Sequence, residues 1–217
     1  MFHATPAPEA PALAPVAVVA QSNFAFGPAP ERTRTRLRVH RENSDVLVGE
    51  SATIGGTLAA PRPGLTRGRQ VALQVLRRGG WETVARTRTA RGGRFRVSYQ
   101  PQALGVADLR VRFAGSASLA ASTVRVRPVE SFRVAVASWY GGYGSTACGE
   151  RLTPTTLGVA NKTLPCGTMV TLRYGGRTVT VPVIDRGPFV PGREFDLTEG
   201  TRNVLGFEGV GAVWSSR

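Results

Sequence analysis

Apolar residues and arginines alternate strictly along several short segments between residues 32 and 129. In residues 94–99, for example, three apolar side chains alternate with two arginines and a serine, and the same period of two recurs in residues 107–113 and 123–127. A period of two places successive side chains on opposite faces of a strand. The pattern therefore predicts antiparallel sheets with one face in a core and the other in water.

Seven segments of this region are expected to be strands: 35–40, 51–58, 70–76, 81–87, 94–99, 107–113 and 123–127. Glycine-containing turns at residues 78–80 and 91–93 separate neighbouring segments. Seven short strands with such turns are typical of an antiparallel β-sandwich. Residues 32–129 also resemble the immunoglobulin-like (Ig-like) domains of exported actinobacterial proteins.

Positive charge is concentrated in the same region. The 217 residues contain 28 Lys+Arg and 14 Asp+Glu, a net charge of +14, and residues 31–130 hold 19 arginines against 7 acids. The arginines are either a solvated face that keeps sheet edges apart or a surface for anionic wall polymers or a membrane. Specific nucleic-acid binding is not expected, because neither a recognition helix nor an aromatic-rich RNA motif is present.

Residues 1–31 are rich in Ala and Pro and are expected to be a disordered leader or tether. The apolar run at 12–20 is similar to a weak signal-peptide core, but no positive charge precedes it. A truncated export signal and a flexible tether both remain open, and both suit an exported protein, extracellular or in the cell wall. No stretch approaches ~18 apolar residues, so no transmembrane segment is expected.

Residues 132–217 differ in composition: they are rich in glycine and lack the alternating arginines of the preceding region. Strands are expected at 134–140, 168–174, 177–184 and 210–214. Thr198 can cap a short helix that runs to about Leu205, with Gly206 as its end. A single short helix in a glycine-rich β domain favours a small closed barrel over an open sheet.

Cysteine and histidine are scarce. Cys148 and Cys166, the only two cysteines, enclose 17 residues. In an exported chain they are expected to form a disulfide; the alternative is two buried thiols in a cytoplasmic protein. With two histidines, His3 and His40, a histidine-centred triad or an HExxH zinc site is not expected. No metal, nucleotide or redox cofactor is indicated.

Two carboxylates stand out because apolar residues flank them. Asp185 follows an apolar stretch and precedes Arg186, and Asp196 lies between Phe195 and Leu197. A carboxylate in such a place needs a partner or a raised pKa. A purely structural alternative is that Asp185 pairs with Arg186 or Arg193 and that Asp196 hydrogen-bonds the start of the helix.

Five motifs occur in order in this part of the chain: ASWYG at 137–141, TACGE at 146–150, TLPCGT at 163–168, VIDRGPF at 183–189 and GREFDLT at 192–198. With these motifs, residues 135–213 resemble the double-psi β-barrel domain of the rare lipoprotein A (RlpA) family, close to its actinobacterial members. The resemblance implies a six-stranded barrel that acts on cell-wall glycan. The expected architecture is thus all-β, with an Ig-like sandwich at 32–129 followed by an RlpA-like double-psi β-barrel at 132–217.

The resemblance also assigns residues. It implies Glu150, Asp185 and Asp196 as the catalytic carboxylates. It implies the following substrate-binding residues: Trp139, Tyr140, Thr146, Asn161, Arg186 and Arg193. The two aromatic residues among these either stack on sugar or plug the barrel. Asn161 stands where the family has a histidine, and an amide cannot exchange a proton near neutrality.

The predicted function is that of an exported lytic transglycosylase, which cleaves peptidoglycan glycan strands to 1,6-anhydro ends. The alternative is a non-catalytic, expansin-like protein that binds and loosens wall polysaccharide. Either Asp185 or Asp196 is expected to donate the proton, with Glu150 and Asn161 positioning the sugar.

Overall fold

The computed structural model describes residues 1, 31–41, 45–62 and 64–217. The leader or tether predicted at 1–31, with its apolar run, therefore lies outside the described residues except at its two ends. In the part of the chain that is described, no helix is long and apolar enough to cross a membrane.

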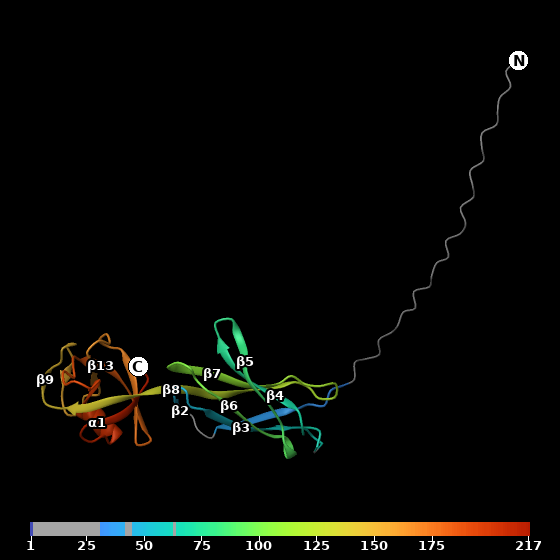
Figure 1. Cartoon of the computed structure of the whole chain (residues 1–217), viewed down its shortest axis with the longest axis horizontal. Helices are drawn as coiled ribbons and strands as arrows, with labels where there is room; N and C mark the ends of the chain where they lie inside the picture. Colours follow the sequence, from blue (N-terminus) through green and yellow to red (C-terminus); the bar gives the residue numbers. More distant parts are fainter. Residues whose placement is uncertain (2–30, 42–44, 63) are drawn as a thin grey trace. The chain divides into compact units, whose positions relative to one another are not determined.

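The N-terminal domain consists of two antiparallel sheets (Figure 1). One sheet has the order β1–β3–β6 and the other the order β5–β4–β7–β8, with β2 added in parallel to β8. The strands are β1 (Arg36–Arg41), β2 (Asp45–Leu47), β3 (Ala52–Ala59), β4 (Gln70–Arg77), β5 (Gly80–Arg88), β6 (Arg94–Tyr99), β7 (Gly105–Phe113) and β8 (Ser122–Tyr140). A short 3₁₀ turn, Arg91–Gly93, precedes β6.

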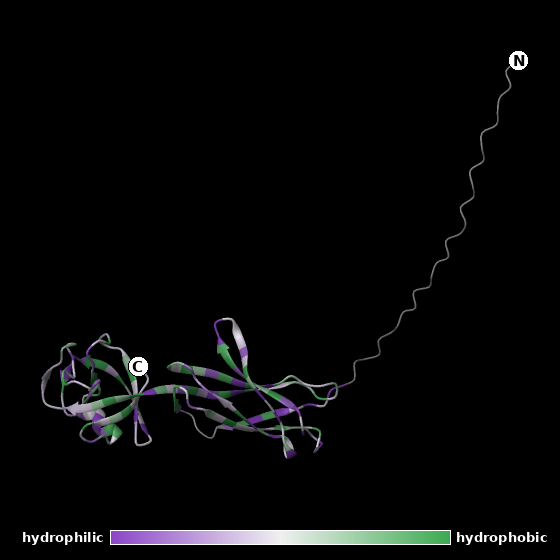
Figure 2. Ribbon diagram, in the orientation of Figure 1, coloured by the Kyte–Doolittle hydropathy of each residue, from purple (hydrophilic) through white to green (hydrophobic). Residues whose placement is uncertain are grey.

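Alternation places the apolar faces of both sheets in one core. Ile54 and Val97 from the first sheet and Leu73 and Val111 from the second are buried together, whereas the arginines that alternate with such residues remain exposed or partly exposed. Figure 2 shows the resulting change between hydrophobic and hydrophilic residues along these strands. The first six strands predicted here and the observed strands agree within two residues at each end.

Strand β8 is longer than either strand predicted in its place. The sequence indicated separate strands at 123–127 and 134–140, but Ser122–Tyr140 is one continuous strand of 19 residues. Its first part pairs with β7 and β2, and its second part pairs with β15 and β14. The proposed boundary near residue 130 therefore falls within a strand rather than a loop.

The second part of β8 belongs to a closed ring of strands. Among the described residues, pairing runs through β8, β14, β11, β13, β12 and β15 and then returns to β8. The elements after β8 are β9 (Gly144–Ser145), β10 (Arg151–Leu152), β11 (Val159–Ala160), β12 (Met169–Tyr174), β13 (Arg177–Asp185), β14 (Phe195–Thr198), α1 (Glu199–Leu205) and β15 (Gly211–Ser215). A second apolar core, including Leu172, Val183 and Leu197, fills this C-terminal domain.

The helix α1 begins and ends where the sequence predicts. The Thr198 hydroxyl accepts a hydrogen bond from the Thr201 backbone N–H, which caps the helix. Gly206 ends the helix in the left-handed conformation, at φ 65°.

Gly200, in the first turn of α1, is in close contact with the loop before β11. A Cβ at this position would lie 2.6 Å from the Thr156 carbonyl oxygen and 2.8 Å from that of Thr155. Gly200→Ala is therefore expected to lower the free energy of unfolding by about 1–3 kcal/mol because it overpacks a rigid contact. Helix propensity alone predicts the opposite sign. Urea denaturation measures the difference.

Val204→Ala is the matched control, since Val204 is exposed on the same helix and its substitution should change stability by less than about 0.5 kcal/mol. A Gly200→Ala protein as stable as this control would show that the contact with the loop does not constrain α1.

Candidate active site

Polar residues from three of four neighbouring strands lie in one row across the C-terminal domain. Ala160 of β11 pairs with Asp185 of β13 on one side and with Asp196 of β14 on the other. Asp196 in turn pairs with Ser138 of β8. Residues opposite one another in a sheet share a face. At about 4.8 Å per strand, the Cα atoms of the two aspartates are roughly 10 Å apart.

A β-bulge in β13 puts Asp185 into this row. Val159 pairs with Val183, but the next residue of β11, Ala160, pairs with Asp185, so Ile184 is an extra residue on β13. Bulges of this kind re-aim the side chain that follows them. The space for Ile184 depends on Gly158, because a Cβ on Gly158 would lie 2.5 Å from the Ile184 side chain.

Two backbone amides hold the Asp185 carboxylate. Its Oδ1 atom accepts hydrogen bonds from the N–H groups of Ala147 and Arg186, each 2.8 Å long. The carboxylate forms no ion pair with Arg186 or Arg193 in the structure described, so it is not neutralised in the way that the structural alternative supposes.

Cys148 and Cys166 form the predicted disulfide. Both segments that it joins are hydrogen-bonded to β13. The Cys148 N–H donates to the Ile184 carbonyl at 3.2 Å, and the Gly167 N–H donates to the Val183 carbonyl at 2.8 Å. The bridge thus fixes the loop that carries the Ala147 amide next to the end of β13.

Asp196 is half-buried and accepts a 2.7 Å hydrogen bond from the Ser138 hydroxyl. Burial raises the pKa of Asp196 above its ordinary value. The Ser138 hydrogen bond and the charge of Arg193 oppose this shift, and the charge of Asp185 adds to it. Asp196 therefore holds its proton more tightly than an ordinary aspartate does.

Tyr140 lies two residues beyond Ser138 on β8, on the same face of the strand. Its hydroxyl is buried and, among the described residues, is the one buried side-chain polar atom without a hydrogen-bond partner. Burial, followed by the negative charges of Asp185 and Asp196, raises the pKa of Tyr140. The hydroxyl is close enough to interact with Asp185 but does not have the geometry of a hydrogen bond to it. It is a protonated donor without an acceptor.

Asn161 is almost completely buried and organises the turn that follows β11. Its Oδ1 atom accepts hydrogen bonds from the N–H groups of Thr163 at 3.0 Å and Leu164 at 2.8 Å, and its Nδ2 atom donates to the Glu194 carbonyl at 3.1 Å. Both acceptor positions and one of the two donors of the amide are thus used within the protein.

Arg186 supports the same turn. Its Nη1 atom donates to the carbonyl oxygens of Asn161 at 3.1 Å and Leu164 at 2.9 Å, and its Nη2 atom lies 3.1 Å from the Cys166 sulfur. The guanidinium therefore points to the loop rather than to the Asp185 carboxylate.

Glu150 and Thr146 close the β9–β10 hairpin. Their backbones are linked by a 2.9 Å hydrogen bond, and the Thr146 hydroxyl accepts from the Glu150 N–H at 3.0 Å. Thr146 is buried, whereas Glu150 is exposed. The Glu150 carboxylate is consequently available from solvent beside the loop that binds Asp185.

Trp139 lies on the opposite face of β8 from Ser138 and Tyr140, because side chains alternate along a strand. The Arg202 guanidinium of α1 lies 4.3 Å from the centre of its ring. The structure thus brings Asp185, Asp196 and Tyr140 together but places Trp139 towards the helix.

Sequence reasoning did not identify Ser138, Gly158 or the Ala147 amide as parts of the site. A serine within an otherwise apolar strand was the available signal for Ser138. The roles of the other two residues arise from the bulge and the disulfide loop, which no local pattern indicates.

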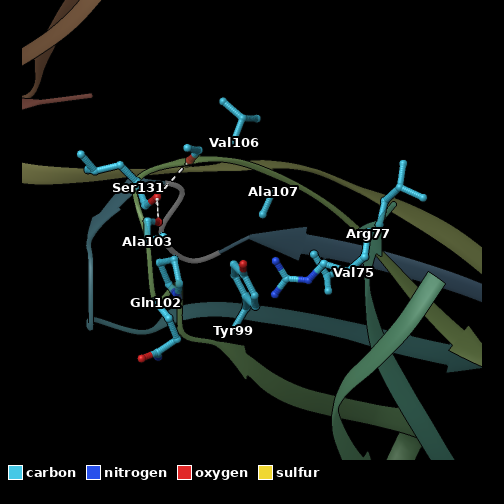
Figure 3. Close-up of a pocket in the computed structure, with 12 residues that line it drawn as sticks. Val75, Arg77, Tyr99, Gln102, Ala103, Val106, Ala107 and Ser131 are labelled. Carbon is cyan, nitrogen blue, oxygen red and sulfur yellow. Dashed lines mark hydrogen bonds between the residues drawn. The ribbon is translucent and has the colours of Figure 1, made fainter. Parts of the chain in front are cut away.

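No cluster of three or more His, Cys, Asp or Glu side chains among the described residues is arranged to hold a metal ion. A cavity of about 160 Å³ lies in the N-terminal domain, next to Tyr99 and Ala103 (Figure 3). Ser131 donates hydrogen bonds to the carbonyls of Ala103 and Gly105 at its rim. No carboxylate or imidazole lines this cavity, so the cavity itself offers no carboxyl or imidazole group for acid–base chemistry.

The raised pKa of Asp196 makes stability depend on pH in a defined direction. A carboxyl whose folded-state pKa is raised binds its proton more tightly in the folded state, so its favourable contribution is lost as pH rises through that pKa. Asp196→Asn removes the buried charge and keeps an oxygen for Ser138. The variant should match the parent below the ordinary carboxyl pKa and be more stable at neutral pH.

Urea unfolding at several pH values tests this expectation. Asp108→Asn, which removes an exposed carboxylate of the N-terminal domain, controls for the change in net charge. A difference between Asp196→Asn and the parent that stays constant with pH would contradict the assigned effect of burial.

The C-terminal domain is similar in sequence to known peptidoglycan-cleaving proteins. Residues 133–214 match the DPBB_1 family, described as lytic transglycolase. The chain is 38% identical over 118 residues to the probable endolytic peptidoglycan transglycosylase RlpA of Nostoc sp., covering 50% of this chain and 32% of that protein. The corresponding protein of Synechocystis sp. is 37% identical over 139 residues, covering 61% and 40%.

Among solved structures, the Streptomyces papain inhibitor matches with 26% identity and a TM-score of 0.32, covering 38% of this chain and 91% of that one. The chain spans between about a third and two fifths of the curated relatives named above. Residues 133–214 are therefore an RlpA-like domain of the DPBB lytic transglycosylase type, homologous to endolytic peptidoglycan transglycosylases.

Proposed function

We propose that the chain is an exported protein whose C-terminal domain cleaves peptidoglycan glycan strands by lytic transglycosylation. One observation carries this proposal. Two carboxylates of unlike environment, Asp185 and Asp196, flank Ala160 in one row of the sheet. The homology of residues 133–214 to RlpA proteins supports the reaction class, and the disulfide is consistent with export.

The proposal includes a finer description of the fold. The six-stranded ring at 132–217 is taken to be a double-psi β-barrel, and the sandwich at 32–129 an Ig-like domain of the actinobacterial type. The order of parallel and antiparallel pairs in the ring and the two antiparallel sheets of the sandwich support these assignments.

In the proposed reaction Asp196 protonates the glycosidic oxygen as the bond from that oxygen to C1 of the sugar breaks. The C6 hydroxyl oxygen of the same sugar then attacks C1, and its proton passes to a carboxylate. The product carries a 1,6-anhydro ring, and no water is consumed. A general acid works best when its pKa lies near the working pH, and burial moves the pKa of Asp196 in that direction.

Asp185 suits the accepting role. Its Oδ1 atom is held by two backbone N–H groups, which fixes its orientation without the need for a cation. Glu150 and Thr146 at the hairpin and Arg193 near Asp196 are proposed to position the glycan. Asn161 and Arg186 are proposed to act through the loop that they hold. Trp139 retains a proposed stacking role only through the part of its ring that Arg202 leaves exposed.

A non-catalytic wall-binding protein is the second candidate. The observation that favours it is that the Asn161 amide makes hydrogen bonds to three backbone groups. This position therefore supports the loop and provides no ionisable side chain for catalysis. A binder would retain wall glycan without producing new chain ends.

The two candidates are separated by Asp196→Asn and Asp185→Asn variants assayed on purified glycan strands without peptides. We expect each to lower the release of 1,6-anhydro products by at least about 100-fold, the usual contribution of general acid–base catalysis. Mass spectrometry of the products measures the effect. Glu208→Gln, an exposed acid paired with Arg202, is the control and should retain activity.

Parent protein that sediments with glycan but yields no anhydro ends would establish the binding function instead. Full activity in both aspartate variants would reject the carboxylate assignment.

Tyr140→Phe is expected to separate stability from activity. Removal of a buried hydroxyl without a partner should leave the free energy of unfolding equal or raise it by up to about 1–3 kcal/mol. Activity should nevertheless fall, because the site loses a donor that lies close to the carboxylates and has no partner among the described residues. Urea denaturation and the rate of product release measure the two effects.

Tyr174→Phe, at a partly exposed tyrosine of β12, is the control for removing a phenolic oxygen. A Tyr140→Phe protein with the parent's activity would show that the hydroxyl takes no part in the reaction.

A further inference from the structure

The outer face of the β5–β4–β7–β8 sheet carries a cluster of four arginines, Arg86, Arg110, Arg112 and Arg125, here called the arginine face. Pairing defines its layout. Ala72 of β4 lies between Arg86 of β5 and Arg112 of β7, and Arg110 of β7 lies directly opposite Arg125 of β8. All four point away from the core, because the residues that alternate with them, such as Val111 and Val126, are buried or, like Ala85, pack against the core.

A polar network fixes the centre of this face. The Arg110 Nε atom donates to the Gln74 Oε1 atom at 2.8 Å, and the Gln74 Nε2 atom donates to the Thr83 hydroxyl at 3.1 Å. Gln74 itself is buried. The guanidinium of Arg110 lies 4.3 Å from the centre of the Trp81 ring, and that of Arg125 lies 5.8 Å from it. The arginines are thus oriented before any ligand binds, which reduces the entropy lost on binding.

The four members of the arginine face are not paired with carboxylates. Among the described residues, no carboxylate forms an ion pair with any of its four members. Like charges directly opposite on adjacent strands are unfavourable. Burial and the charges of Arg112 and Arg125 lower the pKa of Arg110. The Nη atoms of Arg110 have no partner among the described residues, so they are free to contact an anion.

We propose that the arginine face binds a phosphodiester-linked polymer of the cell wall. The choice of a wall polymer rests on the proposed function of the C-terminal domain. Guanidinium groups bind phosphate through paired N–H donors, and several arginines in two rows fit a ligand that repeats its charge along a chain. The bound polymer supplies the negative charge that the face lacks.

Nucleic acid fits this face less well. Single-stranded nucleic acids bind through bases that stack on exposed aromatic rings. Trp81 is an aromatic residue of this face, and the guanidinium groups of Arg110 and Arg125 lie over its ring. The face offers charge without a stacking platform.

The test uses the full chain and soluble poly(glycerol phosphate) as the probe, with titration calorimetry at several salt concentrations. Arg110→Gln/Arg125→Gln should weaken binding at least about tenfold and lower the salt slope. Arg36→Gln/Arg38→Gln on β1, two exposed arginines of the other sheet, removes the same charge and should change affinity no more than about threefold. Duplex DNA and vesicles of phosphatidylglycerol are measured in parallel.

An equal loss in the two double variants would overturn the proposal, because net charge alone would then explain binding. Tighter binding of DNA or of vesicles than of the polymer would also overturn it. The Arg110→Gln/Arg125→Gln protein should cleave soluble glycan strands at the parental rate. An inactive parent that still binds the polymer would reject the transglycosylase proposal and leave the arginine face supported.

Discussion

The register between β13, β11 and β14 is the constraint on which the candidate active site depends. Because side chains alternate along a strand, a shift of one residue would turn Asp185 to the other face of the sheet. The extra residue Ile184 sets this register, and Gly158 provides the space in which Ile184 fits. The distance between the two carboxylates is thus determined by backbone hydrogen bonds rather than by flexible side chains, which is how a site is held in a reactive geometry.

The same arrangement places polar groups where they cost stability. Asp196 is half-buried with a raised pKa, and the Tyr140 hydroxyl is buried without a partner. A partly buried charge and a buried hydroxyl without a partner lower the free energy of unfolding, and such groups tend to occur where function requires them. Both groups lie on adjacent strands, β8 and β14, near one row of the sheet. In this respect the region differs from the N-terminal core, whose buried residues are mainly apolar.

Much of the fold could be predicted because its local patterns are strong. The alternation of apolar residues with arginines located the strands of the sandwich, and Thr198 and Gly206 bounded α1 correctly. Strands β9, β10, β11 and β14 have only two to four residues, too few to show a period. The continuity of β8 could not be predicted either, because it depends on pairing with strands that lie elsewhere in the sequence. Strands β7 and β2 pair with its first part, and β15 and β14 pair with its second part. The aspartates were recognisable from motifs, but Ser138 and Gly158 enter the site through pairing that sequence does not display.

The Asn161 side chain holds the turn after β11 through bonds that a histidine could not all make. The Asn161 amide accepts two backbone N–H groups and donates to a carbonyl at the same time. A neutral imidazole has one acceptor and one donor, so it could not make all three bonds. Arg186 binds two carbonyls of the same turn. Position 161 therefore contributes loop geometry here, and the proposed reaction assigns proton transfer to Asp185 and Asp196 instead.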